Sequence, residues 1–281
     1  MIFDEAIKEM DRSGLTQSNP RNFLDYCKKF NLKPGRTAEH ISIDSLDKLS
    51  KELKENQCMV FRLGSISGEK GTRFGLAKTI NSWEDYFITD KNVFNKDSIK
   101  TFIPNCSHRK LFPFSLMETL TETSLVNLSI TSGLLGHALN LDSDELSSAP
   151  ATGRSTFTFN FQPTPKSEKV WSHENGQIEI DSLFVSRRNG EEKLFVIEAK
   201  VGTKFSTLAK HKLAYPGMAL QKTIPDHLEL IPVYLKVIRT EDQKRFIFHV
   251  SECRFKQAKQ DPIAISDLSP TNNTSSWEVR I

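Results

Sequence analysis

Apolar and polar residues alternate with a period of two along several segments of the C-terminal half. The clearest example is segment 155–161, in which three phenylalanines stand at alternate positions. Such alternation is typical of a half-buried strand. Between two further segments that indicate strands, the dipeptide Asn189-Gly190 favours a tight hairpin turn. The strands expected in this half are 155–161, 177–186, 193–200, 229–238 and 245–255.

Apolar residues spaced three or four apart indicate helices elsewhere. Segment 115–141 predicts one long helix, which two internal glycines can bend. A second helix, 205–221, follows the third strand, and Pro216-Gly217 is expected to divide it into two pieces. The chain beyond Gln260 is rich in Ser, Thr, Asn and Pro and is expected to lie loosely on the surface. This order of elements predicts a mixed α/β fold, with a mixed sheet flanked by helices.

The first part of the chain has a different pattern, mostly helical and then strand-like. Pro104 and Pro113 interrupt the pattern and mark a boundary. We therefore expect an N-terminal α+β module at 1–113 and a second domain at 114–281. The module is expected to contain helices at 1–10, 21–30 and 45–55 and strands at 58–63 and 72–77.

Composition narrows the class of protein. The 281 residues and 32.0 kDa suit two modest domains. The longest apolar runs, of about four residues, are far shorter than the roughly 20 that a membrane-spanning helix needs. The first residues lack the basic and apolar stretches of a secretory signal. The four cysteines are sparse and form no C-x-x-C pair, which argues against a zinc finger and favours the reducing cytoplasm.

Charge and short motifs exclude further classes. The formal net charge of +3 is too small for a histone-like protein, but it is compatible with a basic cleft offset by an acidic metal site. The glycine-rich phosphate loop of P-loop NTPases is absent, and so is the nucleophile elbow of serine hydrolases.

Charged side chains gather at the ends of the second and third expected strands. Because successive side chains on a strand alternate sides, Glu179 and Asp181 share one face, and Glu198 and Lys200 share another. The intervening hairpin makes the two strands neighbours, so these faces can converge. Charges on otherwise apolar strands cost several kcal/mol unless they are paired or metal-bound. Carboxylate oxygens are the ligands that Mg²⁺ prefers, so a magnesium site is expected here.

Asp181 followed by Glu198-Ala199-Lys200 resembles the signature of the PD-(D/E)xK nuclease superfamily, which includes most Type II restriction endonucleases. The resemblance covers about 115–255. It implies a restriction-endonuclease-like core: a helix, a three-stranded meander, a helix and a further strand. It also implies that Asp181 and Glu198 bind the metal, that Lys200 serves catalysis and that the substrate is a DNA phosphodiester. Ile180 stands where many members have proline.

The acid-x-lysine pattern is weak on its own, because it recurs three times in polar contexts. Only Glu198-x-Lys200 follows an apolar strand and has an acidic strand residue 17 positions earlier. The alternative interpretation is a pair of surface ion pairs at the strand ends. The three other occurrences are Glu52-Leu53-Lys54, Glu191-Glu192-Lys193 and Asp242-Gln243-Lys244.

Many members of the superfamily add a glutamate from the preceding helix, and Glu118 and Glu122 both lie on segment 115–141. We favour Glu122; the alternative is an exposed acid stabilised by the helix dipole. Glu179 is a further candidate ligand, or else a partner for Lys200.

Segment 200–222 contains several lysines and no acid, which beside a metal site is typical of a phosphate-contacting face. A solvated helix face explains the same pattern. His173, His211 and Tyr215 are other residues that this cleft can include. The candidate DNA-contacting residues are Lys204, Lys210, Lys212, Arg62 and Arg73.

Three functions are compatible with these observations. The first is a Mg²⁺-dependent Type II restriction enzyme acting on double-stranded DNA as a homodimer, with the N-terminal module serving recognition or dimerisation. The second is a structure-specific or repair nuclease of the same chemistry. The third is a DNA-binding module with an inactive nuclease fold.

Overall fold

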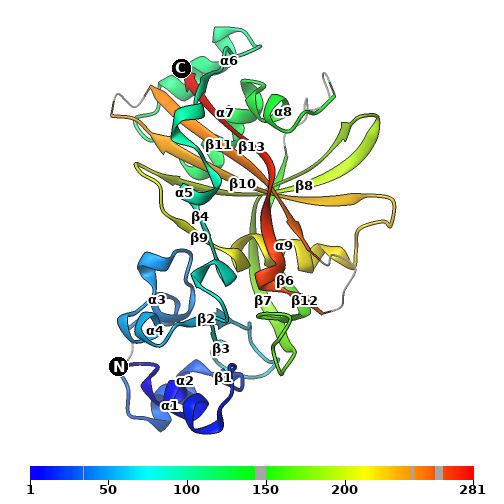
Figure 1. Cartoon of the computed structure of the whole chain (residues 1–281). Coiled ribbons are helices and arrows are strands. Elements are labelled where there is room, and N and C mark those ends of the chain that lie inside the picture. The colour runs from blue at the N-terminus through cyan, green and yellow to red at the C-terminus, as the bar shows by residue number, and fades with distance from the viewer. Residues whose placement is uncertain (34, 143–149, 242–243, 257–261) are drawn as a thin grey trace.

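The computed structural model describes residues 1–33, 35–142, 150–241, 244–256 and 262–281, which fold around an eight-stranded mixed sheet (Figure 1). The predicted mixed α/β fold is thereby confirmed. Its strands lie in the spatial order β12-β6-β7-β8-β10-β11-β13-β5. Their bounds are β5 Lys100–Thr101, β6 Ala151–Gln162, β7 Trp171–Arg188, β8 Glu191–Gly202, β10 Glu229–Arg239, β11 Arg245–Phe255, β12 Ile263–Ala264 and β13 Leu268–Arg280.

Strands β6, β7 and β8 form an antiparallel meander. The predicted Asn189-Gly190 turn joins β7 to β8, and both residues have the positive φ (54° and 78°) that such a tight turn requires. Asp142 fixes the turn, because its carboxylate accepts hydrogen bonds from the backbone N–H of Asn189 (3.0 Å) and Gly190 (2.9 Å). In this register Ser182 pairs with Ile197. Asp181 and Glu198, the residues next to this pair in the sequence, therefore lie at the same end of the hairpin.

Helix α9 (Lys210–Gln221) connects β8 to β10, and these two strands are parallel. The helix begins five residues later than expected because Thr207–Ala209 forms strand β9, which pairs with β4 (Phe87–Thr89). The predicted division of the helix was wrong: Pro216 lies inside one continuous α9. The buried packing of the helix holds it together despite the backbone hydrogen bond that proline cannot donate.

The expected long helix at 115–141 is instead divided into α6 (His108–Ser115), α7 (Glu122–Thr131) and α8 (Leu134–Ala138). Gly133 separates α7 from α8 with a φ of 81°. A Cβ at this position would lie 2.3 Å from Oδ1 of Asn105, so only glycine allows this close approach.

The two faces of the sheet are covered by different parts of the chain. Along β8, Phe195, Ile197 and Ala199 pack with α6, α7 and α8 in one hydrophobic cluster. The opposite face of the sheet is covered by α9 and by apolar residues of segment 1–94, here called the N-terminal segment. Side chains at the alternate positions of β8, Glu198 among them, therefore point toward α9.

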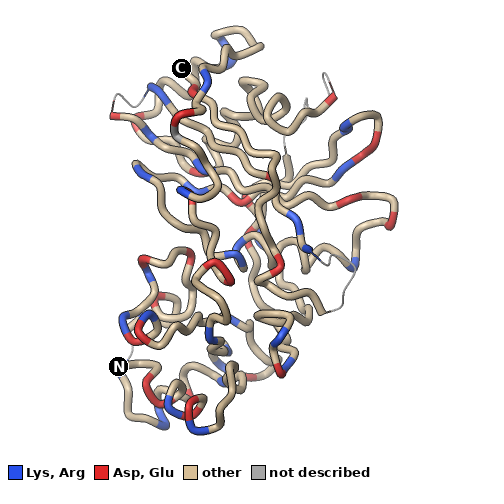
Figure 2. The backbone as a smooth tube through the Cα atoms, viewed as in Figure 1, with Lys and Arg blue, Asp and Glu red and all other residues tan. Residues whose placement is uncertain are grey.

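The N-terminal segment packs directly against this second face. Phe61 lies edge-on to Trp171 with ring centroids 5.8 Å apart, and the buried apolar residues of this region form one cluster with residues of α9. The predicted boundary at 113 falls within α6, and β5 pairs with β13. Basic and acidic residues are interspersed along this segment, at the bottom of the view in Figure 2. Its main elements are α1 Asp4–Ser13, β1 Arg21–Asn22, α2 Phe23–Lys29, α3 Thr37–Ile41, α4 Lys51–Glu55, β2 Cys58–Arg62, β3 Arg73–Lys78 and α5 Asp90–Val93.

The polar C-terminal tail does not lie loosely on the surface, so this prediction was wrong. Gln260 is outside the described residues, but β13 pairs antiparallel with β11 for most of its length (Figure 1). Backbone hydrogen bonding and buried residues such as Val279 and Ser276 hold it in the sheet. Among the helices of the described residues, none has the length and apolar character needed to span a membrane.

Candidate functional site

The structure brings together three of the acidic residues that the sequence singled out. Asp181 immediately precedes the part of β7 that pairs with β8, and its Oδ2 accepts a hydrogen bond from the backbone N–H of Ala199 (2.8 Å). Glu122, the first residue of α7, accepts through Oε1 from the backbone N–H of Val201 (3.2 Å). Two carboxylates thus accept hydrogen bonds from the backbone of β8, at the residues just before and just after Lys200. Glu198 is the next residue back along the same strand.

Glu198 is the most buried of these acids, with 5% of its surface exposed. Burial raises the pKa of Glu198 to about 8, and the negative charges of Asp181 and Glu122 contribute in the same direction. Burial likewise raises the pKa of Asp181, although the N–H of Ala199 opposes the shift. Because the charges of neighbouring carboxylates make ionisation of Glu198 and Asp181 less favourable, a bound cation would stabilise their ionised forms.

The lysine next to Glu198 is Lys212. Its Nζ lies 3.5 Å from Oε1 of Glu198, and the charges of Glu198 and Asp181 raise the pKa of Lys212. Lys212 is the third residue of α9, so the crossover helix carries the ammonium group to the strand. The sequence indicated Lys212 only as a DNA contact. The expected start of the helix at 205 did not place Lys212 in its first turn, and that start was wrong by five residues.

Lys200, the lysine of the motif, has different partners. Its Nζ donates to the backbone oxygens of Asp44 (3.2 Å) and Thr207 (3.1 Å), and burial lowers its pKa. Its ammonium group therefore ties the N-terminal segment to the residues just before α9. The role of Lys200 in catalysis stays a prediction of the resemblance, whereas the ammonium group beside Glu198 is that of Lys212.

The remaining candidates lie in several places. Glu179 is exposed and forms an ion pair with Arg154 (3.6 Å). Lys204 is exposed, and Arg73 lies 3.6 Å from Glu174. Glu179, Lys212 and Arg62 all line a cavity of about 220 Å³ between the N-terminal segment, β7 and α9.

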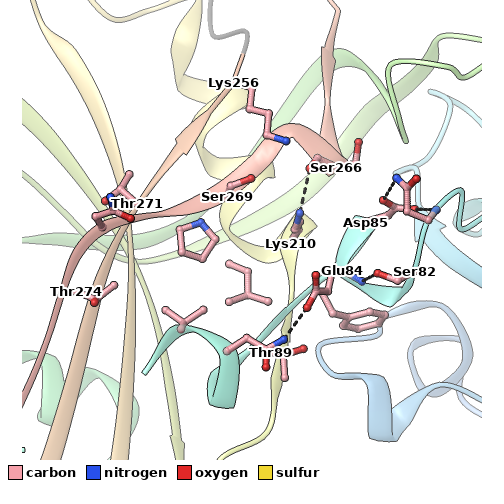
Figure 3. A pocket seen from close by; sticks show the side chains of 17 residues that line it. Ser82, Glu84, Asp85, Thr89, Lys210, Lys256, Ser266, Ser269, Thr271 and Thr274 are labelled. Atoms are coloured by element: carbon pink, nitrogen blue, oxygen red, sulfur yellow. Dashed lines mark hydrogen bonds between the residues drawn. The ribbon is translucent and has the colours of Figure 1, made fainter. Parts of the chain in front are cut away.

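Lys210 does not face the carboxylates. It is buried, donates to the backbone oxygen of Ser266 (3.0 Å) and lines a separate cavity of about 630 Å³, which Lys256 and Glu84 also line (Figure 3). Burial lowers the pKa of Lys210 to about 8. This position separates it from the predicted DNA-contacting face.

The donor set fits Mg²⁺ in one particular mode. Across the described ranges, no group of three or more His, Cys, Asp or Glu residues is arranged to hold a metal ion. However, Mg²⁺ is usually held through one or two carboxylates, with waters and substrate phosphates completing the octahedron. Asp181 and Glu198 provide two such carboxylates, and hard oxygen ligands are the type that this ion needs.

The model of a protein family matches residues 91–266, more than half of the chain. The chain belongs to this family, described as Domain of unknown function (DUF6997). No curated protein and no solved structure matches it.

The DUF6997 segment includes all four residues at the centre of the site: Asp181, Glu198, Lys212 and Glu122. Arg62, which lines the adjoining cavity, and strand β13 lie outside it. The acidic site is therefore a feature of the family segment, while the cavity is completed by residues that precede it.

Glu198 makes the stability of the metal-free protein depend on pH. Its pKa is 4.5 in an ordinary environment and about 8 when folded, so the folded protein holds a proton that the unfolded chain releases. The free energy of unfolding should therefore fall as the pH rises from about 4.5 to about 8, by a few kcal/mol at about 1.4 kcal/mol per pKa unit. Urea unfolding in EDTA at several pH values measures this slope.

The variant Glu198→Gln should flatten that slope, because glutamine does not titrate. Glu192→Gln, which replaces an exposed acid of the same strand, should leave it unchanged. Equal slopes in wild type and Glu198→Gln would show that Glu198 has an ordinary pKa.

Proposed function

We propose that this protein is a Mg²⁺-dependent endodeoxyribonuclease of the PD-(D/E)xK type that hydrolyses DNA phosphodiester bonds. The observation that carries the proposal is the juxtaposition of Asp181 and Glu198 on neighbouring strands with Lys212 at 3.5 Å from Glu198. Two carboxylates and an ammonium group are what a metal-assisted attack on a phosphate needs: ligands for the ion and a positive charge for the phosphate oxygens.

The topology supports the same assignment. Helices α7 and α8 are followed by the meander β6-β7-β8, by α9 and then by β10, parallel to β8. This is the element order that the resemblance to restriction endonucleases implies. The acidic residues lie on the second and third strands of the meander, as that resemblance also implies.

Each side chain has a definable task. Asp181 and Glu198 would hold Mg²⁺, which when bound lowers the pKa of a water and stabilises charge on a phosphate oxygen. The N–H of Ala199 fixes one oxygen of Asp181 and leaves the other as a ligand. Lys212, whose Nζ lies 3.5 Å from Glu198, would contact the scissile phosphate. The positive charge then sits where negative charge develops during hydrolysis.

Double-stranded DNA cut at a defined sequence, as by a Type II restriction enzyme, is the substrate that we favour. A two-fold homodimer would place one site on each strand. The N-terminal segment is attached to the site through Asp44 and Arg62, so it is positioned to read the DNA near the cleaved bond. We further propose that the protein acts in the cytoplasm, where it meets this substrate.

Incubation of the purified protein with plasmid and phage DNA in Mg²⁺ tests the proposal. We expect discrete fragments that EDTA abolishes and that Asp181→Ala does not produce. Cleavage of branched but not linear duplex DNA would favour a structure-specific nuclease. Binding of DNA without cleavage in any form, with Asp181→Ala binding as well as wild type, would favour the inactive module and contradict the proposal.

A further inference from the structure

The cavity of about 220 Å³ adjoins the acidic site. It lies between the N-terminal segment, β7 and α9, and the exposed residues Ser42, Gln177 and Glu179 line it together with buried ones. Lys212 connects the two places, because it lines the cavity and its Nζ lies 3.5 Å from Glu198. A group held in the cavity would therefore be next to the bond that the proposed nuclease cuts.

Four polar atoms of residues that line the cavity are buried without a hydrogen-bond partner in the described structure: Oδ1 of Asp44, Nε of Arg62, Nε2 of His173 and Nδ1 of His211. Buried polar groups in proteins are nearly always satisfied by protein, water or ligand. An ionised carboxylate can only accept and a guanidinium can only donate, whereas a neutral imidazole can do either. The walls of the cavity therefore offer both hydrogen-bond donors and acceptors. They complement a ligand whose edge also carries both donors and acceptors.

The charge states of these groups follow from their surroundings. Burial by itself would raise the pKa of Asp44, but the hydrogen bond from Lys48 and the charge of Lys200 lower it, so Asp44 is ionised. Burial lowers the pKa of His211 to about 3, so its imidazole is neutral.

The other walls of the cavity are aromatic and rigid. The ring of Tyr215 lies 5.0 Å from that of His173 and 5.3 Å from that of His211, centroid to centroid. The hydroxyl of Tyr215 donates to the backbone oxygen of Arg62 (3.2 Å), which fixes the ring. Flat walls with polar atoms at their edges suit a flat ligand with hydrogen-bonding edges.

The size of the cavity limits its occupant. Sites for drug-sized ligands are about 300–1,000 Å³, so a cavity of about 220 Å³ suits a single ring system. Enzymes that take a base out of the DNA stack hold it in such a pocket, between aromatic side chains and with hydrogen bonds to its edge.

We infer that this cavity receives one nucleobase unstacked from the DNA, and that Asp44, Arg62 and His211 read its edge. This inference rests on the proposed nuclease function, since it deepens that function into a way of recognising the DNA. Arg62, which the sequence indicated as a DNA contact, would then contact a base and not a phosphate. The N-terminal segment would supply specificity to the family segment that carries the carboxylates.

Titration of the full-length protein with the four deoxynucleoside 5′-monophosphates, in EDTA, tests the inference by calorimetry. 2-Deoxyribose 5-phosphate is the comparison, because it carries the same phosphate without the base. We expect at least one nucleotide to bind about tenfold or more tightly than the sugar phosphate. Ser42→Trp, at an exposed wall position, should remove this difference by filling the mouth of the cavity, and Ser42→Ala should retain it.

A second variant tests the polar edge. His211→Phe keeps a ring of similar shape against Phe61 and Tyr215 but removes the imidazole nitrogens, so the preference among the four bases should decrease. Equal binding of sugar phosphate and nucleotides, or no binding of either, would overturn the base pocket even if the protein cuts DNA. Selective nucleotide binding that Ser42→Trp removes would uphold the pocket even if DNA is not cut, in which case only the nuclease proposal fails.

Discussion

Lys212→Met should reduce the rate of DNA cleavage by at least about a hundredfold, the loss typical when one preorganised charge is removed from a reacting centre. Its Nζ is the cation that the structure places 3.5 Å from Glu198. Without it, the carboxylate loses the charge that opposes its raised pKa and the scissile phosphate loses a contact. Single-turnover cleavage of a plasmid substrate at saturating Mg²⁺ measures the effect.

Three matched variants sharpen this test. Lys212→Arg keeps the charge and should restore part of the rate, and Lys222→Met, at an exposed lysine after the same helix, should leave it unchanged. Lys200→Met should leave cleavage within about tenfold but destabilise the protein by about 1–3 kcal/mol, because the part-buried backbone oxygens of Asp44 and Thr207 each lose a hydrogen bond from a charged donor. Loss of cleavage in Lys200→Met together with full activity in Lys212→Met would return the catalytic role to the lysine of the motif.

Lys236→Met should lower the free energy of unfolding by about 3–5 kcal/mol, the usual cost of leaving a buried charge without its partner. Lys236 and Asp90 are 1% and 0% exposed and lie 3.6 Å apart. Asp90 also accepts hydrogen bonds from the Tyr234 hydroxyl and the backbone N–H of Ser206, both at 2.8 Å. These two neutral donors cannot replace the lost positive charge. Urea unfolding measures the difference.

The control for this prediction is a surface ion pair. Lys8→Met removes an exposed lysine 2.7 Å from Glu5, and it should change the free energy of unfolding by less than about 1 kcal/mol. A decrease of similar size for Lys8→Met and Lys236→Met would mean that burial of the Lys236–Asp90 pair adds nothing to its importance.

Local patterns in the sequence were sufficient to predict the meander and its acidic residues. Asn189-Gly190 fixes the hairpin because a tight turn needs two positive φ values, and the alternation of the strands then sets which side chains share a face. Both signals are local in the sequence, so the approach of Asp181 to the strand of Glu198 could be anticipated, although the hydrogen bonds from the turn to Asp142 could not.

Contacts between distant segments could not be predicted in the same way. The division of the helix at Gly133 depends on Asn105, 28 residues earlier, which leaves no space for a Cβ. The sequence of strand β13 lacks a clear alternation of apolar and polar residues, because backbone pairing with β11 provides much of the interaction that keeps it in the sheet. Likewise, Lys200 turns to the oxygen of Asp44 in another part of the chain, and Lys212 reaches Glu198 only because α9 crosses that face.

The parallel pairing of β8 with β10 has a consequence for recombination between genes. It sets Tyr234 beside Glu198 and Lys236 beside Lys200, and both β10 residues depend on Asp90, which precedes the DUF6997 segment by one residue. A crossover at the start of that segment would join it to a foreign N-terminal partner and leave Lys236 buried without its counterion. Exchange of this segment between proteins should therefore cost stability unless the crossover lies upstream of Asp90 or the new partner supplies an acid at the same place.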